Sequence, residues 1–295
     1  MQLAAVKPNQ LAVIKDNRFV LISDALAQEG NLAKGASMID LIAAYDSLKG
    51  AIERVASKGP GIPLDPQQLR PPVERPSKIW GAAGNYQRGS AGIDSAAGRG
   101  AARQSTPEEI IETTFLKPSS AVVGPEDNIV IPKNAETIFP ELELCAIIGK
   151  QVRNIPKEQA LDAVFGYTII LDVTARGYGA NKSLVATRSV RKGFDTFAPI
   201  GPWTTTKDEI PDPQNLTMRL WVNGELRQSA STSGMINGVA ELVSYLSTVS
   251  TLYPGDLIAT GNPDSPEFQK KLAAGDVLKA EIQSIGAMNL HVTRH

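Results

Sequence analysis

Two glutamates, Glu141 and Glu143, stand one residue apart and lead directly into an apolar run that ends at Ile148. Successive side chains of a strand point to opposite faces, so both carboxylates are expected on the same face of this segment. Two carboxylates at the point where a strand enters the core repel each other unless a cation or protons neutralise them. The pair therefore predicts either a basic partner or a bound cation.

A third acid, Asp172, interrupts the almost continuous apolar run of residues 167–173. An isolated ionised aspartate inside such a strand would be costly. Three oxygen ligands without a nearby histidine favour a hard cation such as Mg²⁺, Mn²⁺ or Ca²⁺ over zinc. The only histidines, His291 and His295, lie at the C-terminal end of the sequence. On spacing alone, carboxylates at strand ends with basic partners remain the alternative to a metal site.

The elements that must position these acids belong to a region rich in short β-like runs. The runs cover residues 129–131, 142–148, 167–173, 217–222, 257–260, 277–282 and 289–292. Turn signals such as Asn223-Gly224 separate them, and two helical patterns interrupt them at residues 157–164 and 239–249. Many short strands with few helices predict a β-rich α+β fold.

The first 75 residues are expected to form a small N-terminal domain that precedes a larger domain at residues 76–295. Apolar runs at 11–14 and 19–22 flank Asp16-Asn17, which suits a hairpin. A helix should then begin after the N-cap Ser37 and end at Gly59-Pro60, because apolar residues recur at three- and four-residue steps between them. The proline-rich stretch from residue 60 to residue 76 reads as a connector.

A segment rich in glycine and alanine, residues 81–103, follows the start of the larger domain. It has few large apolar side chains and cannot bury much surface, so we expect it to be mobile. Thr106, Pro107 and Glu109 then supply an N-cap, a proline at the first helical position and an acid at the third. This pattern predicts a short helix that ends near Thr113.

Composition excludes several classes of protein. The 295 residues are 42% hydrophobic, and 30 basic against 31 acidic residues give a net charge of -1 without long blocks of one sign. We therefore expect no nucleic-acid partner. The single cysteine, Cys145, excludes an intramolecular disulfide, fits a reducing compartment and is interpreted as a small buried hydrophobe. No secretory signal pattern and no run of about 18 apolar residues occurs, so a cytoplasmic protein without membrane contact is expected.

A series of short motifs surrounds the three acids between about Ile79 and Val292. They read FLKPSSAVVGP at 115–125, ELEL at 141–144, GYT at 166–168, DVTAR at 172–176, KGFDTFAPIGPW at 192–203, VNGE at 222–225, Gln228, TLYPGD at 251–256 and TGNP at 260–263. In this order the motifs resemble the core of the fumarylacetoacetate hydrolase family. The resemblance implies a mixed β-barrel-like catalytic domain with a small N-terminal α/β domain, commonly assembled as a homodimer.

The resemblance also implies roles for individual residues. Glu141, Glu143 and Asp172 would be the ligands of Mg²⁺ or Mn²⁺. Arg176 and Lys192 would lie on the substrate side of the metal, and Thr196 beside it. The remaining candidates would form the wall that receives the substrate carboxylate: Thr260, Gly261 and Asn262.

These roles agree with known chemistry. A metal that is chelated by a 2-oxo acid polarises the oxo group and stabilises an enolate. Carbon–carbon cleavage, decarboxylation, hydration and tautomerisation can therefore share one site. Lys192 could neutralise the oxyanion or, if desolvated, act as a base; without the motif it would read as an ion-paired or surface lysine.

The sequence departs from the family pattern in the expected lid. Many hydrolytic and decarboxylating members place a histidine after the Asn-Tyr of this region and a glutamate three residues later. Here Asn85-Tyr86 continues with Gln87-Arg88-Gly89, so the histidine is absent, and Gly92 occupies the later position. The candidates to replace this pair are glutamates of the short helix, Glu108, Glu109 and Glu112, of which the first two otherwise belong to a solvated N-terminal turn. The candidates to hold a second carboxylate, or else to be solvated, are Arg88, Arg99 and Arg103. Asn262 stands where threonine is usual, which indicates a changed pocket.

The sequence favours a metal-dependent hydrolase that cleaves a carbon–carbon bond in a 2-oxo or 1,3-dioxo acid of the acylpyruvate type. The first alternative is a lyase or isomerase acting on a 2-oxo acid: a decarboxylase, a 2-oxo-3-deoxy acid dehydratase or a tautomerase. The second alternative is a paralogue that binds metal and ligand without turnover, against which the retention of the three acids with Arg176 and Lys192 argues.

Overall fold

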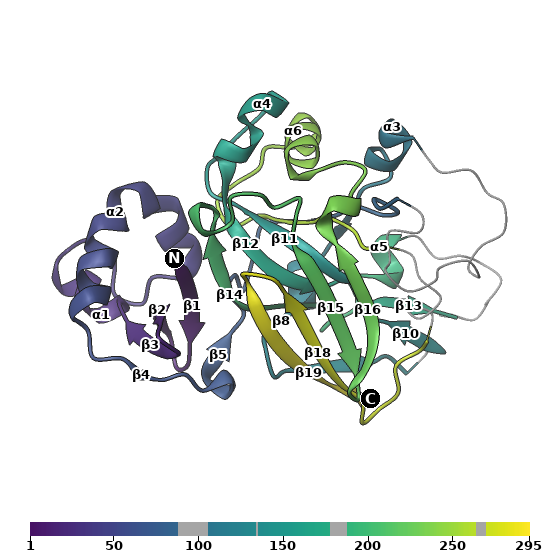
Figure 1. The fold of residues 1–295 in the computed structure, drawn as a ribbon, viewed down its shortest axis with the longest axis horizontal. Helices are drawn as coiled ribbons and strands as arrows, with labels where there is room; N and C mark the ends of the chain where they lie inside the picture. The colour runs from purple at the N-terminus through teal and green to yellow at the C-terminus, as the bar shows by residue number, and fades with distance from the viewer. Residues whose placement is uncertain (88–105, 134, 178–187, 264–269) are drawn as a thin grey trace.

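The computed structural model describes residues 1–87, 106–133, 135–177, 188–263 and 270–295, and its architecture is α+β with large sheets and few helices (Figure 1). The expected fold class is therefore confirmed. No helix in these ranges is both long and apolar enough to cross a membrane. The predicted mobile segment lies mainly outside the described residues, as do Arg88, Gly92, Arg99 and Arg103.

The largest sheet has twelve strands and places the two acid-bearing segments side by side at its centre. Its main path runs β4-β3-β2-β1-β14-β12-β11-β17-β6-β7, with β5 on β1 and β8 on β14. In that order the strands are β4 (Ile62–Pro63), β3 (Arg18–Leu21), β2 (Gln10–Lys15), β1 (Gln2–Val6), β14 (Ala198–Thr206), β12 (Val164–Leu171), β11 (Leu142–Ile148), β17 (Leu257–Ala259), β6 (Ile79–Gly81) and β7 (Phe115–Lys117), then β5 (Leu69–Arg70) and β8 (Val122–Val123). Its end strands β4 and β7 do not pair with each other in the described residues, so the sheet is barrel-like only loosely.

A five-stranded sheet and a two-stranded sheet complete the β-structure. The larger follows the order β16-β15-β18-β19-β9, and β10 pairs with β13. The bounds are β16 (Glu225–Ser231), β15 (Thr217–Val222), β18 (Val277–Ile282), β19 (Gly286–Arg294), β9 (Asn128–Ile131), β10 (Thr137–Phe139) and β13 (Thr174–Arg176). The helices are α1 (Ser23–Gln28), α2 (Met38–Lys58), α3 (Pro107–Ile111), α4 (Lys157–Ala160), α5 (Arg188–Arg191) and α6 (Val239–Val249).

Strand β11 is buried on both faces, which explains its unbroken apolar sequence. Leu142 and Leu144 belong to the core cluster that includes residues of the five-stranded sheet. Cys145 and Ile147 belong to the opposite cluster, which includes the apolar face of α2. Glu143 therefore projects from the same face as Cys145, and away from its leucine neighbours.

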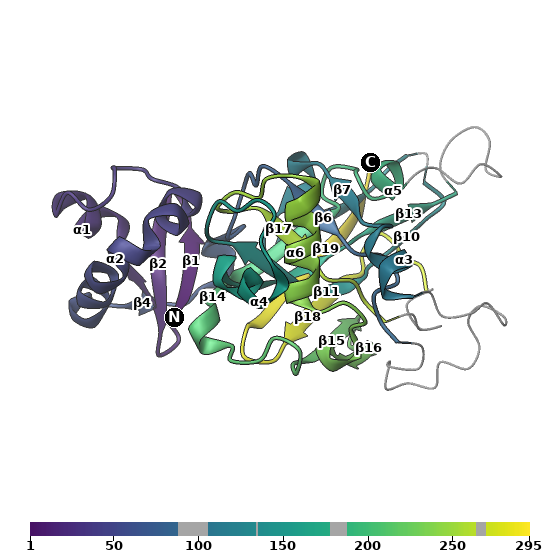
Figure 2. The same cartoon turned by 90° about the horizontal axis from the view of Figure 1, so that it is seen from above.

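The N-terminal unit lies at one end of the molecule and contains the predicted hairpin and helix (Figures 1 and 2). Helix α2 begins after Ser37, whose hydroxyl accepts a hydrogen bond from the backbone N–H of Asp40, and its C-cap is Gly59. Strand β1 pairs with β14, where Leu3 faces Thr204, so this unit extends the central sheet. The division between residues 75 and 76 stays a prediction.

Two predicted boundaries are wrong for one reason. The helix expected at residues 157–164 ends as α4 at Ala160, a 3-10 turn follows, and Val164 already begins β12. Strand β12 ends at Leu171, so Asp172 follows the strand instead of interrupting it. Antiparallel pairing with β11 and β14 fixes these limits, and such tertiary pairing overrides the local pattern.

Candidate metal centre

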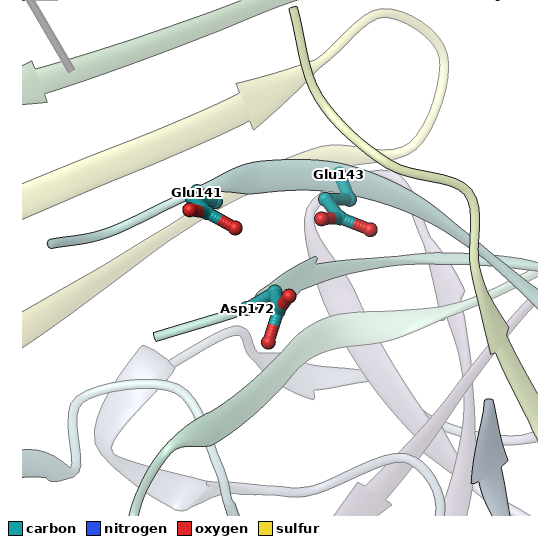
Figure 3. Close-up of side chains that lie close together, drawn as sticks. All are labelled: Glu141, Glu143 and Asp172. Atoms are coloured by element: carbon teal, nitrogen blue, oxygen red, sulfur yellow. The ribbon is translucent and has the colours of Figure 1, made fainter. Parts of the chain in front are cut away.

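The three predicted acids come together where β11 begins and β12 ends. Leu142 pairs with Leu171, and the backbone N–H of Asp172 donates to the carbonyl of Glu141 at 2.8 Å. Each acid offers one carboxylate oxygen, and these oxygens lie within 4.8 Å of one another (Figure 3). The residues Glu143 and Asp172 are each 1% exposed, whereas the Glu141 side chain is 22% exposed. The cluster is therefore buried but open on the side of Glu141.

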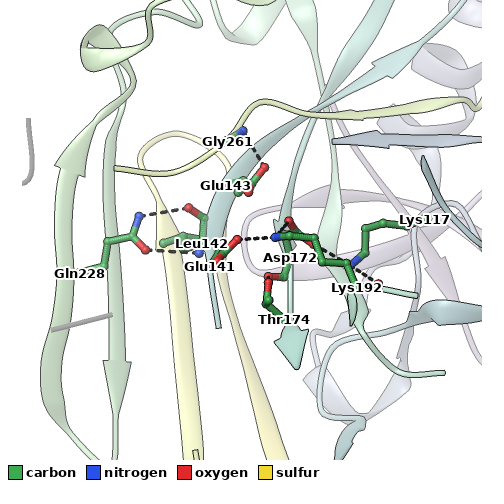
Figure 4. A network of polar contacts seen from close by, with 9 residues as sticks. All are labelled: Lys117, Glu141, Leu142, Glu143, Asp172, Thr174, Lys192, Gln228 and Gly261. Carbon is green, nitrogen blue, oxygen red and sulfur yellow. Dashed lines mark hydrogen bonds and ion pairs between the residues drawn. The ribbon is translucent and has the colours of Figure 1, made fainter. Parts of the chain in front are cut away.

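Two lysines face the acids from other elements (Figure 4). Lys192 Nζ lies 2.6 Å from Glu141 Oε2 and also donates to Asp172 Oδ2. Lys117 Nζ lies 2.6 Å from Asp172 Oδ1 and donates to the carbonyl of Lys192 at 2.6 Å. The sequence analysis proposed Lys192 but gave no role to Lys117. Strand alternation offered a signal, because Phe115 and Lys117 share the buried face of β7.

Burial and charge set the protonation of these groups. Burial by itself would raise the pKa of Asp172, but the charges and hydrogen bonds of Lys117 and Lys192 outweigh it and lower that pKa. Burial likewise opposes the charge of Lys192, yet Asp172 and the two glutamates raise its pKa above the ordinary value. For Glu143, burial first and then the charges of Asp172 and Glu141 raise the pKa well above its usual range.

The donor set fits a hard divalent cation. Three carboxylates and two lysines in one cluster leave an excess of one negative charge when all are ionised. Burial is the main cause of the raised pKa of Glu143, and the charges of Asp172 and Glu141 add to it. Oxygen ligands of this kind suit Mg²⁺ or Mn²⁺ better than zinc.

The segment that follows β17 lies beside Glu143. The backbone N–H of Gly261 donates to Glu143 Oε2 at 2.6 Å, and the hydroxyl of Thr260 donates to the carbonyl of Leu144 at 2.9 Å. Gly261 has φ +89°, and a Cβ atom there would lie 2.9 Å from the carbonyl oxygen of Ala82. Thr260 and Gly261 therefore lie next to the acids, while their role toward a substrate stays a prediction, as does that of Asn262.

The two other predicted residues have different surroundings. Thr196 Oγ1 accepts a hydrogen bond from the N–H of Val130 at 2.9 Å, so its hydroxyl oxygen already supports the backbone of β9. Arg176 is exposed, and its guanidinium carbon lies 4.9 Å from the centre of the Phe139 ring. Neither contact tests the predicted roles of Thr196 and Arg176.

Arg191 is a further cation that the sequence analysis missed, although it directly precedes Lys192. Within the described part of the chain its Nε atom is buried and has no hydrogen-bond partner. Burial and then the charges of Arg188 and Arg176 lower the pKa of Arg191, while Glu141 and Asp172 raise it. The guanidinium therefore lies within electrostatic range of the acidic cluster.

Glu109, one of the acids of the short helix, forms a hydrogen bond at the start of that helix. Helix α3 begins as predicted, because Thr106 and Glu109 form a capping box. The Glu109 carboxylate accepts a hydrogen bond from the N–H of Thr106 at 2.9 Å. This contact supports an N-terminal capping role for Glu109.

Comparison with known proteins shows which family has a similar sequence. The model of the fumarylacetoacetate hydrolase C-terminal domain matches residues 78–293. A maleylpyruvate hydrolase of Aquipseudomonas alcaligenes is 36% identical over 296 residues, covering 99% of both chains. A mitochondrial oxaloacetate tautomerase of Bos taurus is 34% identical over 275 residues, which cover 90% of this chain and 82% of the relative.

A solved structure extends the likeness to the whole fold. Maleylpyruvate hydrolase from Sphingobium sp. SYK-6, crystallised with manganese(II) and pyruvate, superimposes with a TM-score of 0.81 at 35% identity. The superposition covers 100% of this chain and 99% of that one. The sequence match and the shared fold together show that the chain belongs to the fumarylacetoacetate hydrolase family.

Proposed function

We propose that this protein is a hydrolase that depends on Mg²⁺ or Mn²⁺ and cleaves a carbon–carbon bond in a 2-oxo or 1,3-dioxo acid of the acylpyruvate type. The observation that carries the proposal is the buried set of three carboxylates within 4.8 Å of one another. Glu141, Glu143 and Asp172 would hold the ion. When bound, the ion polarises the oxo group of the substrate and stabilises negative charge there.

Lys192 has the properties of a charge-stabilising group. Its pKa is raised by Asp172 and the glutamates, so it is cationic at neutral pH. A permanently charged ammonium is a poor base but a good partner for a developing oxyanion. We therefore assign Lys192 to stabilisation of the substrate anion. Lys117 would hold Asp172 and the Lys192 backbone in place through its two hydrogen bonds.

The rim of the site suits an anionic substrate. Arg176 and Arg191 have no ion-pair partner among the described residues, and both lie within electrostatic range of each other. Cations at the edge of such a site attract and orient the carboxylates of a substrate. Thr260, Gly261 and Asn262 would form the opposite wall, and Thr196 would stay beside the metal.

A lyase or isomerase is the second candidate. The tautomerase among the relatives favours it. So does the absence from Gln87-Arg88-Gly89, the run after Asn85-Tyr86, of a histidine that could activate water. In both reactions a bound cation would stabilise negative charge on the oxo acid, so the acidic cluster fits either. A non-catalytic binding protein remains the third candidate and would bind Mn²⁺ and oxo acids without turnover.

A substrate panel distinguishes these candidates. Acylpyruvates, oxaloacetate and 2-oxo-3-deoxy sugar acids are each incubated with Mg²⁺, with Mn²⁺ and with chelator, and products are identified by NMR. Hydrolysis yields two acids, tautomerisation yields only the enol–oxo interconversion, and decarboxylation releases CO₂. Activity that survives complete removal of metal would contradict the proposal.

We further infer a homodimer in the cytoplasm. Membership of the family, whose members are commonly dimeric, supports the assembly. The single buried Cys145 supports a reducing compartment. Light scattering after size-exclusion chromatography measures the mass, which a monomer would place at 31.5 kDa.

A further inference from the structure

The peptide between the two glutamates is held by a side chain from the other sheet. Gln228 lies on β16, is 0% exposed and reaches Leu142 on β11 (Figure 4). Its Oε1 accepts a hydrogen bond from the N–H of Leu142 at 3.3 Å. Its Nε2 donates to the carbonyl of Leu142 at 3.1 Å. One carboxamide thus satisfies both polar groups of a single residue, as a neighbouring strand would.

This contact lies on the edge of β11 that faces β17, beyond the end of the β11–β17 pairing. Strand β17 pairs with β11 from Cys145 onward, and the N–H of Thr260 continues that edge by donating to the carbonyl of Leu144 at 3.1 Å. Leu142 lies two residues further along the same edge, so its peptide groups point the same way. Gln228 takes the place that an extension of β17 would fill opposite Leu142.

The geometry points to Gln228 as a positioning residue that fixes the spacing of Glu141 and Glu143, the metal-binding pair of the proposed function on which this inference rests. Leu142 is 0% exposed and separates the two acids in sequence. Its N–H and carbonyl would be buried without partners if the carboxamide were absent, and each such group costs about 1–3 kcal/mol. Relief of that cost would require the start of β11 to move, and both carboxylates would move with it.

Hydrogen bonds to other elements also hold the two acids on either side of Leu142. The carbonyl of Glu141 accepts from the N–H of Asp172 at 2.8 Å, and Glu143 is held through Gly261 N–H at 2.6 Å. Glu141 is held further by the ion pair of its Oε2 with Lys192 Nζ at 2.6 Å, so both acids are tied on either side of Leu142. Groups that orient metal ligands in this indirect way typically change metal affinity by about 10–100-fold when they are removed.

The test measures Mn²⁺ affinity directly, without substrate. Gln228→Met removes both hydrogen bonds at similar volume, and EPR of free Mn²⁺ gives the dissociation constant. We expect Mn²⁺ to bind about 10–100-fold more weakly than to the unmodified protein at a temperature where both are folded. A dissociation constant within twofold of the unmodified protein would overturn the inference.

Ser247→Ala is the matched control. The Ser247 hydroxyl is also 0% exposed, accepts from the N–H of Ile155 at 2.9 Å and donates to the carbonyl of Ser244 at 2.7 Å. Its loss should lower the melting temperature, since it breaks a comparable pair of buried bonds, but leave Mn²⁺ affinity unchanged. Equal weakening of Mn²⁺ binding in both variants would show a general stability effect and overturn the positioning role.

If the Gln228→Met variant does not fold, two further measurements test the inference without it. Gln228→Asn keeps the amide but shortens it by one methylene, and it should weaken Mn²⁺ binding in the same direction. In the unmodified metal-free protein, the Leu142 amide should exchange at least about 10²-fold more slowly than in an unstructured peptide. Rapid exchange there would contradict the inference. Absence of Mn²⁺ binding by the unmodified protein would instead overturn the proposed function itself.

Discussion

Two fully buried aspartates, Asp172 and Asp256, pair with lysines and yet have different surroundings. Asp256 is 0% exposed and accepts hydrogen bonds from the N–H groups of Tyr253 at 2.8 Å and Lys78 at 3.1 Å. It also accepts from the Ser77 hydroxyl and pairs with Lys78 Nζ at 2.7 Å. The side-chain oxygens of Asp172 instead accept only from the ammonium groups of two lysines in the described residues.

The difference lies in the type of donor and in the neighbouring charges. Backbone donors of a turn hold Asp256 in one position, and a single lysine balances its charge. Asp172 lies beside two more carboxylates, so its lysines cannot balance all of the charge. A buried ion pair alone is therefore weak evidence of function. An excess of carboxylates over cations is what distinguishes the site from the structural turn.

The largest expected effect is at Asp172. Asp172→Asn removes a proposed ligand and leaves two buried ammonium groups with less negative charge. We expect kcat/KM on the best substrate of the panel to fall by about 10³-fold, which corresponds to about 4 kcal/mol of transition-state stabilisation. EPR should show that Mn²⁺ binding is lost at the same time. Mn²⁺ affinity equal to that of the unmodified protein would remove the distinction between the two aspartates.

Substitution of Asp256 should lower stability and leave metal affinity unchanged. Asp256→Asn breaks the ion pair with Lys78 and places an amide N–H against backbone donors, which should lower the free energy of unfolding by about 3 kcal/mol. Urea denaturation followed by circular dichroism measures this change. Mn²⁺ affinity of the folded fraction should stay within twofold of the unmodified protein. A large loss of affinity without a loss of stability would make Asp256 part of the site.

The third prediction concerns pH and the charge excess at Glu143. Its folded pKa is raised above the ordinary value of 4.5, so the metal-free folded state holds this proton more tightly than the unfolded state does. Stability from this group is therefore lost as pH rises through the folded pKa. A bound divalent cation would offset the negative charge of ionised Glu143. Mn²⁺ should therefore raise the melting temperature by at least about 2 °C more at pH 8 than at pH 5.5.

The protonation of Asp172 should not change between pH 5.5 and pH 8, because its folded pKa is lowered below 3.8. Its contribution to the free energy of unfolding is lost only in stronger acid. Differential scanning fluorimetry at both pH values, with and without Mn²⁺, makes the comparison. Asp256→Asn should show the same pH dependence as the unmodified protein. An equal Mn²⁺ shift at both pH values would contradict the assignment of excess charge to Glu143.

The smallest effect is expected at Cys145, two residues from Glu143 on the same face of β11. Burial raises the pKa of this thiol above its usual range, so it should not react with a disulfide reagent in the folded protein. Cys145→Ala should cost about 1 kcal/mol of stability through a small cavity and change kcat/KM by less than about twofold. Rapid labelling of the native thiol would show that this face of β11 is open.

Local sequence patterns predicted the first and last residues of several elements correctly. Strands β11, β15 and β18 and helix α6 have the predicted limits. Helix α2 has the predicted N-cap and ends at Lys58, with Gly59 as its C-cap. Each combines a clear period with an adjacent turn or cap, so local signals suffice. Strand β14 was not predicted as a strand, because its Ala-Pro-Ile-Gly-Pro start reads locally as a turn, and only its pairing with β1 and β12 makes it central.

The sequence by itself predicted the three acids and Lys192 as a site, through their residue types and the order of the motifs around them. Only the tertiary structure decided what surrounds them: Lys117 comes from β7, Gln228 from β16 and the Gly261 amide from the segment after β17. These contacts join segments that lie 55 to 118 residues apart. Strand pairing across such separations sets the distances between side chains, and no local spacing encodes them.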